Sequence, residues 1–206
     1  MTKRKIGVLG GTFDPIHLGH LIIAEDIREK LGLGEVLFIP AGCPWLKLKE
    51  DKPISAAEHR LAMVRLAIAS NPYFEVSIME IERPGLSYSI DTVLELKAKL
   101  GAGAEIYFIV GPDALAEFPK WKDPARLVEI CQVVGIGRPA YAKANLRKLE
   151  SSIPGASQRI VLVAVPQIDI SSTDIRRRVA QGLSIRYLVP EAVEKYIAEH
   201  KVYVSP

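Results

Sequence analysis

This chain alternates short apolar runs with segments of helical periodicity, and that alternation constrains its fold more than any other feature. The runs are rich in β-branched residues and are continuous, which is typical of parallel strands buried on both faces. Such strands are joined by right-handed helical crossovers that cover both faces of the sheet. The sequence therefore predicts a doubly wound parallel α/β fold, with strands near residues 6–10, 36–42, 74–81, 106–111, 133–137 and 160–165.

The segments between the runs carry helix start and stop signals. Ser55 and Glu58 have the spacing of a capping box, in which each side chain satisfies the other residue's exposed amide. A second helix is predicted over residues 91–100, where a glycine follows, and a helix pair is predicted near the C-terminus. A chain of 206 residues, 49% of them hydrophobic, suits one domain, 1–206, whose last part, 171–206, forms a small C-terminal helical subdomain.

Charge and cysteine use argue against several classes of protein. The formal net charge is only +3, from 27 basic and 24 acidic side chains, so no nucleic-acid or membrane partner is expected. Cys43 and Cys131 lie far apart without a CxxC or a metal-ligand spacing, which favours a reducing compartment. Because no apolar run has the length of a signal peptide or a membrane span, we expect a cytoplasmic protein.

The stretch GGTFDPIHLGH, residues 10–20, follows the first predicted strand and precedes a helical segment. Glycines in such a turn let backbone amides and the helix dipole meet an anion, although the spacing matches neither a P-loop nor a dinucleotide fingerprint. His17 and His20 project on one side of the helix start, within about 6 Å of each other, and can donate to phosphate oxygens. A surface or capping pair is one alternative. A metal pair is another, but no cluster of Cys, Asp or Glu supplies further ligands.

A second anion-binding pattern lies in QIDISSTDIRRRVAQG, residues 167–182. Ser171, Ser172 and Thr173 stand just ahead of an amphipathic helix that carries Arg176 one turn later. Hydroxyls, free amides and an arginine at a helix start favour a bound anion. The plain alternative is a serine N-cap followed by arginines on a solvated face, and we expect that face for the two arginines that follow.

Together these two stretches resemble the HxGH nucleotidyltransferase superfamily. GGTFDPIHLGH resembles its signature GxFxPxHxGH, and ISSTDIR resembles its second signature, ISSTxIR. The resemblance implies a Rossmann-like fold in which the histidines bind the ATP phosphates, while the serine, threonine and arginine embrace the β- and γ-phosphates. The ATP-binding residues it implies are Gly10, Gly11, Thr12, Phe13, His20, Gly111, Asp113, Ser171, Ser172, Thr173 and Arg176.

The middle of the chain resembles one branch of that superfamily, the bacterial-type nicotinate mononucleotide adenylyltransferases. ERPGLSYSIDTV resembles their SYTxDT element, FIVGPDALAEFPKW their FxxGxD…W element, and RLVPEAVEKYI their C-terminal LVPxxVxxYI, so the resemblance spans almost the whole chain. PAGCPWLKLK aligns with their loop PAxxPPHK but departs from it. Trp45 and Leu46 replace the usual Pro and His, which leaves Lys47 as the cation expected to reach phosphate.

These elements imply roles for residues that would bind nicotinate mononucleotide, the acceptor of the adenylyl group. Backbone amides of the turn Ser87, Tyr88 and Ser89 are expected to meet the pyridine carboxylate of nicotinate mononucleotide. Asp113 is expected to bind ribose hydroxyls, and Trp121 to stack on the nicotinate ring. A helix N-cap for Asp113 and a core indole for Trp121 are the structural alternatives.

The resemblance implies an enzyme that transfers the adenylyl group of ATP to nicotinate mononucleotide, with Mg²⁺ held by the ATP phosphates and no metal site of the protein's own. His17, His20, Lys47 and Arg176 are the expected charge stabilisers. No general base is needed, because the acceptor phosphate is already ionised. Nicotinamide mononucleotide and phosphopantetheine are alternative acceptors, and a catalytically silent nucleotide-binding regulator is the rival from another class. The sequence leaves a homo-oligomer open.

Overall fold

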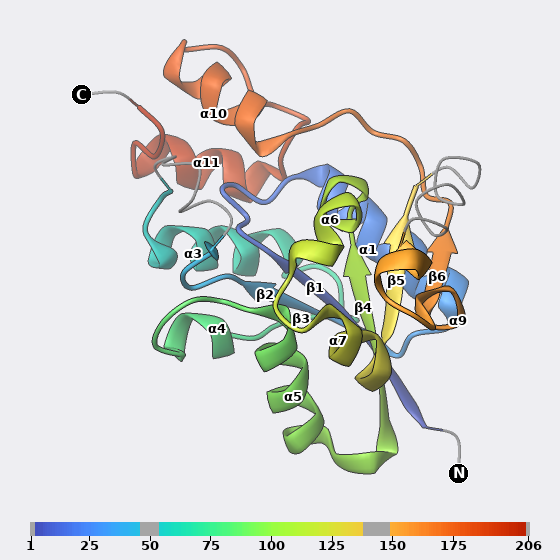
Figure 1. Cartoon of the computed structure of the whole chain (residues 1–206). Helices are drawn as coiled ribbons and strands as arrows, with labels where there is room; N and C mark the ends of the chain where they lie inside the picture. Colours follow the sequence, from blue (N-terminus) through green and yellow to red (C-terminus); the bar gives the residue numbers. More distant parts are fainter. Residues whose placement is uncertain (1–2, 46–53, 138–148, 205–206) are drawn as a thin grey trace.

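The computed structural model describes residues 3–45, 54–137 and 149–204 of the chain. The centre of the fold is a six-stranded, all-parallel sheet in the order β3-β2-β1-β4-β5-β6 (Figure 1). The strands are β1 (Arg4–Gly11), β2 (Glu35–Pro40), β3 (Phe74–Val76), β4 (Ala104–Val110), β5 (Gln132–Ile136) and β6 (Ile160–Val163). The chain runs outward from β1 to β3 and then crosses back to β4, so the strand order reverses between β1 and β4.

Helices connect successive strands and cover the sheet (Figure 1). Between β1 and β3 lie α1 (Leu18–Leu31) and α3 (Ala57–Ile68). Between β3 and β4 lie α4 (Met79–Glu82), α5 (Ser89–Leu100) and the 3-10 turn η1 (Gly101–Gly103). The later helical segments are α6 (Pro112–Glu117), η2 (Phe118–Lys120), α7 (Pro124–Ile130), α9 (Ala156–Arg159), α10 (Ser172–Ala180) and α11 (Glu191–Glu199).

Consecutive strand residues point to opposite faces of the sheet, and each face carries its own apolar core. Val8 and Phe108 belong to the cluster that contains residues of α5 and α7. Their neighbours Leu9 and Ile109 belong to the cluster that contains residues of α1, α3 and both C-terminal helices, α10 through Ile175. The predicted α/β fold with helices on both faces is therefore confirmed.

The apolar run at 74–81 is predicted as one strand, and most of that prediction is wrong. β3 has only three residues, and α4 follows it. The backbone turns at Ser77, whose N–H donates to the Phe38 carbonyl (2.9 Å) and whose hydroxyl accepts from the Met79 N–H (3.4 Å). A short apolar run has the same pattern in a buried strand and in a buried helix, so periodicity alone does not separate them.

The predicted capping box at Ser55 and Glu58 is also wrong. α3 begins at Ala57 without a side-chain cap. Ser55 is held through its backbone: its N–H donates to an Asp14 carboxylate oxygen (3.3 Å), and its carbonyl accepts from the Arg60 guanidinium (3.0 Å). Asp14, 41 residues away in the sequence, and Arg60 of the same helix thus take the place of the local cap.

The other helix boundaries follow the sequence signals closely. α5 begins at Ser89 rather than at residue 91, and it ends where Gly101 takes a positive φ of 69°. The predicted C-terminal helix pair is formed by α10 and α11. Within the described residues, no helix is long and apolar enough to cross a membrane.

Candidate active site

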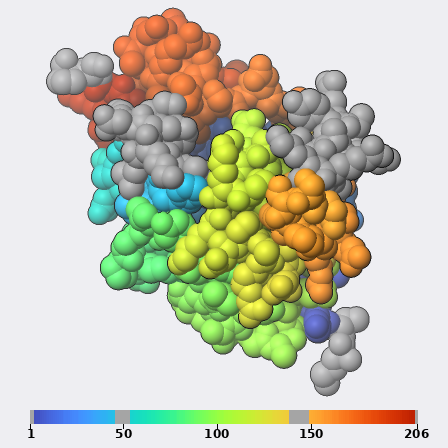
Figure 2. Space-filling view, viewed as in Figure 1, coloured from blue at the N-terminus to red at the C-terminus, as the bar shows by residue number. Residues whose placement is uncertain are grey.

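The carboxyl ends of β1 and β4 open into a cavity of about 620 Å³. Open α/β sheets bind ligands at this position, because the loops on either side of the reversal point diverge and leave a crevice. Its wall includes the turn after β1, the start of α1, the loop after β2, the turn before α5, the start of α6 and the start of α10. Glu80 of α4, Trp121 and Ile136 of β5 also line it. Figure 2 shows the orange and red C-terminal segments at one end of the molecule, next to the yellow-green start of α6.

The two histidines of the first motif line this cavity as a stacked pair. The backbone N–H of His17 donates to Nδ1 of His20 (3.2 Å), and the ring centroids are 3.7 Å apart. Because Nδ1 of His20 accepts a hydrogen bond, the neutral ring carries its proton on Nε2. That tautomer leaves Nε2 of His20 as an N–H donor.

Both histidines are neutral at physiological pH. Burial lowers the pKa of His17 to about 4. Burial, together with the neighbouring His17, holds the pKa of His20 well below its usual value. Nδ1 of His17 is buried without a hydrogen-bond partner, so a polar atom beside the cavity is unsatisfied. Among the described residues, no group of three His, Cys, Asp or Glu side chains could hold a metal ion.

Small and buried neighbours keep the histidine pair in place. A Cβ at Gly19 would lie 3.0 Å from Nδ1 of His17, so a side chain there would displace the ring. Phe13 is buried with a φ of 50°, and its ring meets His20 edge-on at 5.1 Å. The side chain of Phe13 belongs to the core and does not line the cavity, unlike Gly10, Gly11 and Thr12. Any contact of Phe13 with a ligand must therefore come from its backbone.

The start of α10 brings the second motif to the same cavity, and both Ser171 and Ser172 line it. Ser171 is the N-cap, and its hydroxyl accepts from the Asp174 N–H (3.1 Å), as the plain alternative for this motif expects. The Ser172 hydroxyl donates to the Pro15 carbonyl (2.8 Å), within the first motif. The two signatures, at opposite ends of the sequence, are thus in direct contact.

Neither Arg176 nor Thr173 lines the cavity. The Arg176 guanidinium donates to the Asp14 carbonyl (2.7 Å) and to the Thr173 hydroxyl (3.3 Å). Arg177 is exposed and pairs with Asp174. The arginine of the motif therefore holds the turn that precedes the histidines, through the Asp14 carbonyl.

Sequence reasoning missed Arg60, whose side chain is only 1% exposed. Besides its bond to Ser55, the guanidinium donates to the carbonyls of Thr12 (2.8 Å) and Gly42 (3.3 Å). One residue of α3 therefore joins the turn after β1 to the loop after β2. A signal was present, because Arg60 falls on the same helical stripe as the buried Met63 and Val64, where a charge is unusual.

The last turn of the described chain supports the first motif. Asp14 is 4% exposed, and its Oδ1 accepts from the Tyr203 hydroxyl (2.7 Å). Burial and Asp14 raise the pKa of Tyr203, so its hydroxyl remains a donor. The Leu18 N–H, at the start of α1, donates to the Leu188 carbonyl (3.0 Å). No sequence motif marks Tyr203, because the contact joins opposite ends of the chain.

The far end of the cavity is aromatic. Trp121 lines it and packs against Phe118 (5.1 Å between centroids) and edge-on against Phe108 (6.2 Å). The indole is partly buried against the core that contains residues of α5 and α7, as the structural alternative expects, yet it also lines the cavity. Its Nε1 is buried without a hydrogen-bond partner. Trp45 also lines this end and lies 6.0 Å from the Tyr88 ring.

The turn before α5 is the other part of the acceptor end. Ser87 and Ser89 line the cavity, whereas Tyr88 does not; its ring faces Trp45 and the Lys122 ammonium, 4.8 Å away. The Ser87 hydroxyl already accepts from two backbone N–H groups of the loop after β2. α5 has no side-chain cap, and its first intrahelical hydrogen bonds begin at the Asp91 N–H. The N–H groups of Ser89 and Ile90 precede these bonds and can meet a ligand.

Asp113 lies in the first turn of α6 and lines the cavity together with Gly111. The N-cap of this helix is Gly111, so the alternative of an N-cap role for Asp113 is wrong. Its exposed carboxylate is accessible from the cavity. Lys47 and Leu46 lie outside the described residues.

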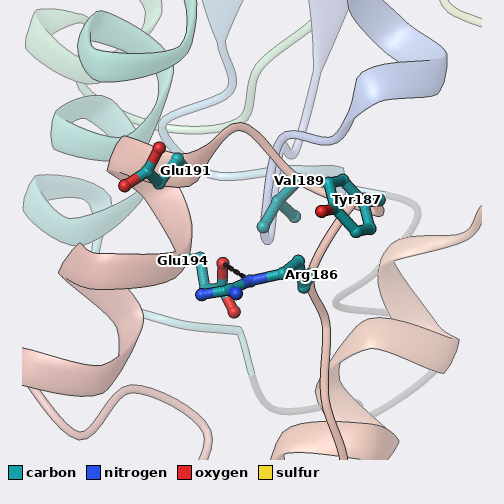
Figure 3. A pocket seen from close by; sticks show the side chains of 5 residues that line it. All are labelled: Arg186, Tyr187, Val189, Glu191 and Glu194. Carbon is teal, nitrogen blue, oxygen red and sulfur yellow. Dashed lines mark ion pairs between the residues drawn. The ribbon is translucent and has the colours of Figure 1, made fainter.

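A smaller hollow of about 210 Å³ lies beside α11 (Figure 3). It is lined by Arg186, Tyr187, Val189, Glu191 and Glu194, none of which sequence reasoning selects as a site residue. Both of its carboxylates are already paired, Glu194 with Arg186 (3.5 Å) and Glu191 with Lys195 (2.7 Å). The hollow also contains neither of the two phosphate-binding motifs. The larger cavity is therefore the candidate active site.

Comparison with known proteins shows the family of the chain. The Cytidylyltransferase-like family model matches residues 8–178. A relative from a Roseiflexus species is 48% identical over 204 residues, 98% of this chain and 100% of its own length. A relative from Dehalococcoides mccartyi is 45% identical over 203 residues, 98% of each chain. Both carry the name "Probable nicotinate-nucleotide adenylyltransferase".

A solved structure from Plasmodium falciparum shares the fold. It is described as a nicotinic acid mononucleotide adenylyltransferase complexed with NaAD. It matches with a TM-score of 0.76 at 20% sequence identity, over 97% of each chain. At that identity the likeness shows the fold alone.

Proposed function

The chain belongs to the cytidylyltransferase-like family and, within it, to the nicotinate-nucleotide adenylyltransferases, and from that premise we propose that it transfers the adenylyl group of ATP to nicotinate mononucleotide. The products are nicotinate adenine dinucleotide and pyrophosphate, in a step of NAD biosynthesis. The observation that carries this function is a single cavity whose wall contains both phosphate-binding motifs and an aromatic acceptor end.

At the donor end, the triphosphate of ATP lies against the turn after β1 and the starts of α1 and α10. Helix N-termini offer free amides and the positive end of the helix dipole. His17 and His20 add neutral N–H donors, whose uncharged state follows from their lowered pKa values. Arg176 contributes positive charge through the Asp14 peptide. The role of Lys47 as a further cation stays a prediction.

At the acceptor end, the pyridine ring of nicotinate mononucleotide stacks on Trp121. Its carboxylate faces the first amides of α5 near Ser89, which a carboxylate satisfies better than a carboxamide does. Asp113 accepts hydrogen bonds from ribose hydroxyls. This assignment is supported by the uncapped helix start and by the indole at the cavity wall.

In the reaction, a phosphate oxygen of the mononucleotide attacks the α-phosphorus of ATP. The new P–O bond forms as the bond to the oxygen that bridges the α- and β-phosphorus breaks, and pyrophosphate leaves with that electron pair. No proton has to be removed, because the attacking phosphate is already ionised. The protein therefore contributes position and charge stabilisation rather than acid–base chemistry.

Mg²⁺ is part of this proposal as an ion carried by the ATP phosphates. When bound, it neutralises charge on the nucleotide and on the departing pyrophosphate. Phosphate oxygens and water are the usual main ligands of Mg²⁺ at nucleotide sites.

Pyrophosphate release from purified protein tests the function. The protein is incubated with ATP and Mg²⁺ and, separately, with nicotinate mononucleotide, nicotinamide mononucleotide and phosphopantetheine. We expect the fastest release with nicotinate mononucleotide. Faster release with either other acceptor would favour that rival enzyme, and ATP binding without release from any of the three would favour the silent regulator.

The cellular setting of the protein follows from the same proposal. We infer a cytoplasmic enzyme whose substrates are two small molecules, and which needs neither nucleic acid nor membrane. A homo-oligomer stays open, and light scattering of the purified protein measures it.

A further inference from the structure

Glu80 of α4 is a buried carboxyl group that the proposed reaction does not use. Its side chain is only 7% exposed, although it stands in the wall of the cavity beside the acceptor turn. The Thr92 hydroxyl, on α5, lies 2.6 Å from its Oε1, and the Ser87 hydroxyl also hydrogen-bonds to the same carboxyl group. Burial raises the pKa of Glu80 above its usual value, and the hydrogen bonds from these two hydroxyls offset part of that rise.

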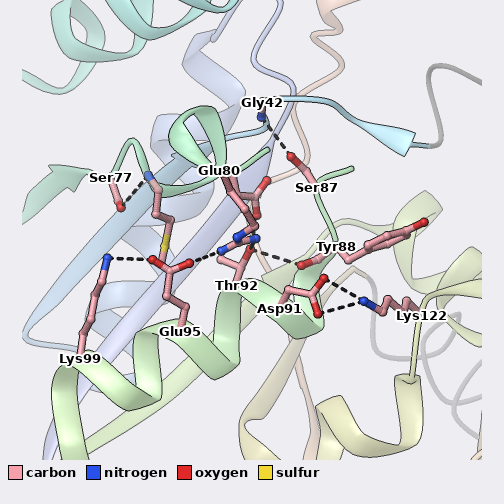
Figure 4. Close-up of polar contacts among 12 residues, drawn as sticks. Gly42, Ser77, Glu80, Ser87, Tyr88, Asp91, Thr92, Glu95, Lys99 and Lys122 are labelled. Carbon is pink, nitrogen blue, oxygen red and sulfur yellow. Dashed lines mark hydrogen bonds and ion pairs between the residues drawn. The ribbon is translucent and has the colours of Figure 1, made fainter. Parts of the chain in front are cut away.

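The direction of each hydrogen bond follows from the other partners of the two hydroxyls (Figure 4). Oγ of Ser87 accepts from the N–H groups of Gly42 (3.1 Å) and Cys43 (3.2 Å). Oγ1 of Thr92 accepts from the Arg83 guanidinium (3.0 Å). Each hydroxyl therefore has its own proton left to donate, and the carboxylate oxygens of Glu80 accept both.

The same contacts lock three segments of the acceptor end together. A Cβ at Gly42 would lie 2.1 Å from the Glu80 carbonyl oxygen, so the loop after β2 packs directly on the backbone of α4. Arg83 extends the network to Glu95 (2.5 Å), which also pairs with Lys99 (2.8 Å) on α5. The Glu80 carboxyl group thus joins the turn, through Ser87, to α5, through Thr92, and the Ser87 hydroxyl in turn holds the loop after β2.

We propose that Glu80 is a positioning residue for the acceptor: its carboxylate fixes the turn Ser87–Ser89 against the loop after β2 and thereby sets the preference for nicotinate over nicotinamide mononucleotide. This inference rests on the proposed function. A rigid set of N–H donors at the start of α5 favours a carboxylate, because a carboxamide turns an NH₂ group toward one of them and leaves it unpaired. When the turn is free to move, that penalty falls.

The test replaces the carboxylate without changing its size. In Glu80→Gln, one of the two oxygens becomes an NH₂ group that cannot accept a hydroxyl proton, so one hydrogen bond of the network is lost. Glu82→Gln is the matched control, because it makes the same charge change at an exposed position of the same helix. Steady-state kinetics with each substrate, at saturating levels of the other, give KM and kcat for parent and variants.

For Glu80→Gln we expect the KM for nicotinate mononucleotide to rise about tenfold and the KM for ATP to stay within about twofold. The ratio of kcat/KM for nicotinate to that for nicotinamide mononucleotide should fall by about tenfold. Glu82→Gln should match the parent. Equal rises in both KM values, an unchanged ratio, or the same effect in Glu82→Gln would each overturn the inference.

A second pair of variants covers the case in which Glu80→Gln does not fold. Thr92→Val removes the donor at the same shape and should reproduce the acceptor-specific change, and Thr92→Ser, which keeps the hydroxyl, should restore it. If Thr92→Val leaves acceptor KM and preference at the parent values, the inference is wrong.

Binding without turnover separates this inference from the proposed function. Both tryptophans of the chain, Trp45 and Trp121, line the cavity, so their fluorescence reports nicotinate mononucleotide binding directly. A parent protein that neither binds nor turns over nicotinate mononucleotide means that the proposed function fails. An active parent with unchanged acceptor binding in Glu80→Gln means that only the role of Glu80 fails.

Discussion

Burial sets the charge of the two histidines at the start of α1. From sequence, each could act as an imidazolium or through one neutral N–H. The stacked geometry and the lowered pKa values select the neutral form. We therefore propose that the histidines act on phosphate as oriented neutral dipoles, and that positive charge at the site comes from helix N-termini and Arg176.

The first prediction concerns His20. His20→Ala should lower kcat by on the order of 100-fold, about 2.7 kcal/mol, with the fold kept. His20→Gln should lose less, because its side-chain amide places a neutral N–H donor near the position of Nε2. Pyrophosphate release measures both, with His200→Ala outside the cavity as the control. Turnover near the parent value in His20→Ala would contradict the assignment.

The second prediction follows from the pKa of His17, which burial lowers from 6.5 to about 4. Between these two values the unfolded chain takes up a proton that the folded protein does not, so this residue makes stability fall as pH falls. His17→Gln lacks that effect. As the pH falls from about 7.5 to about 4, the parent should lose about 3 kcal/mol of unfolding free energy that His17→Gln does not lose.

Urea unfolding of both proteins across this pH range gives the difference. A constant gap between His17→Gln and the parent would show that the ring is protonated as readily in the folded state as in the unfolded one.

At the scale of elements, the motif-bearing loops are held by side chains of neighbouring helices. The turn after β1 and the loop after β2 lie at the carboxyl ends of paired strands, but the polar side chain that joins them belongs to α3. Arg60 suits this place, because one planar guanidinium donates in several directions at once. Glu80 of α4 has the opposite chemistry: its carboxyl group accepts hydrogen bonds from Thr92 of α5 and from Ser87 in the turn before α5.

The third prediction is that Arg60→Lys destabilises the protein by about 2–3 kcal/mol, because an ammonium cannot reach all three carbonyls and leaves buried acceptors unpaired. Arg65→Lys makes the same exchange at an exposed position of α3 and should be close to neutral. Free energies of unfolding in urea measure both. Equal stability of the two variants would rule out the role given to Arg60.

At the scale of the whole molecule, the C-terminal segment completes the site formed by the N-terminal motif. Ser172 contacts the Pro15 carbonyl, Leu188 receives the Leu18 N–H, and Tyr203 donates to Asp14. Apolar residues of α10 and α11 enter the same core as α1 and α3. The donor end of the cavity therefore forms only when the two ends of the chain have docked.

The fourth prediction tests this docking. Tyr203→Phe keeps the ring but leaves Oδ1 of the buried Asp14 without its donor, and should cost about 1–3 kcal/mol of stability. It should also raise the KM for ATP, because the turn that Asp14 anchors lies at the donor end. Tyr187→Phe, at a side chain 81% exposed, is the control for thermal unfolding and kinetics. Loss of stability in both variants to the same extent would contradict the proposed docking.

The sequence alone determined the fold class and the two signatures that mark the site. Continuous β-branched runs and turn glycines favour a local structure through residues that are neighbours in the sequence. They can therefore be recognised without knowing the tertiary contacts. The end of α5 at Gly101 and the N-cap of α10 at Ser171 are local features of the same type, because each depends on residues within one helical turn. The likeness of the middle elements to one enzyme family added the acceptor, as the comparisons then supported.

Only the tertiary structure decided what joins these local features. The end of β3, the backbone role of Ser55, and the links made by Arg60, Glu80 and Tyr203 depend on residues far away in the sequence. The same holds for the charge of the histidines, since a pKa responds to burial and neighbours rather than to residue type. Burial and long-range hydrogen bonds are properties of the packed chain, and the docking of its two ends turns two local signatures into one cavity.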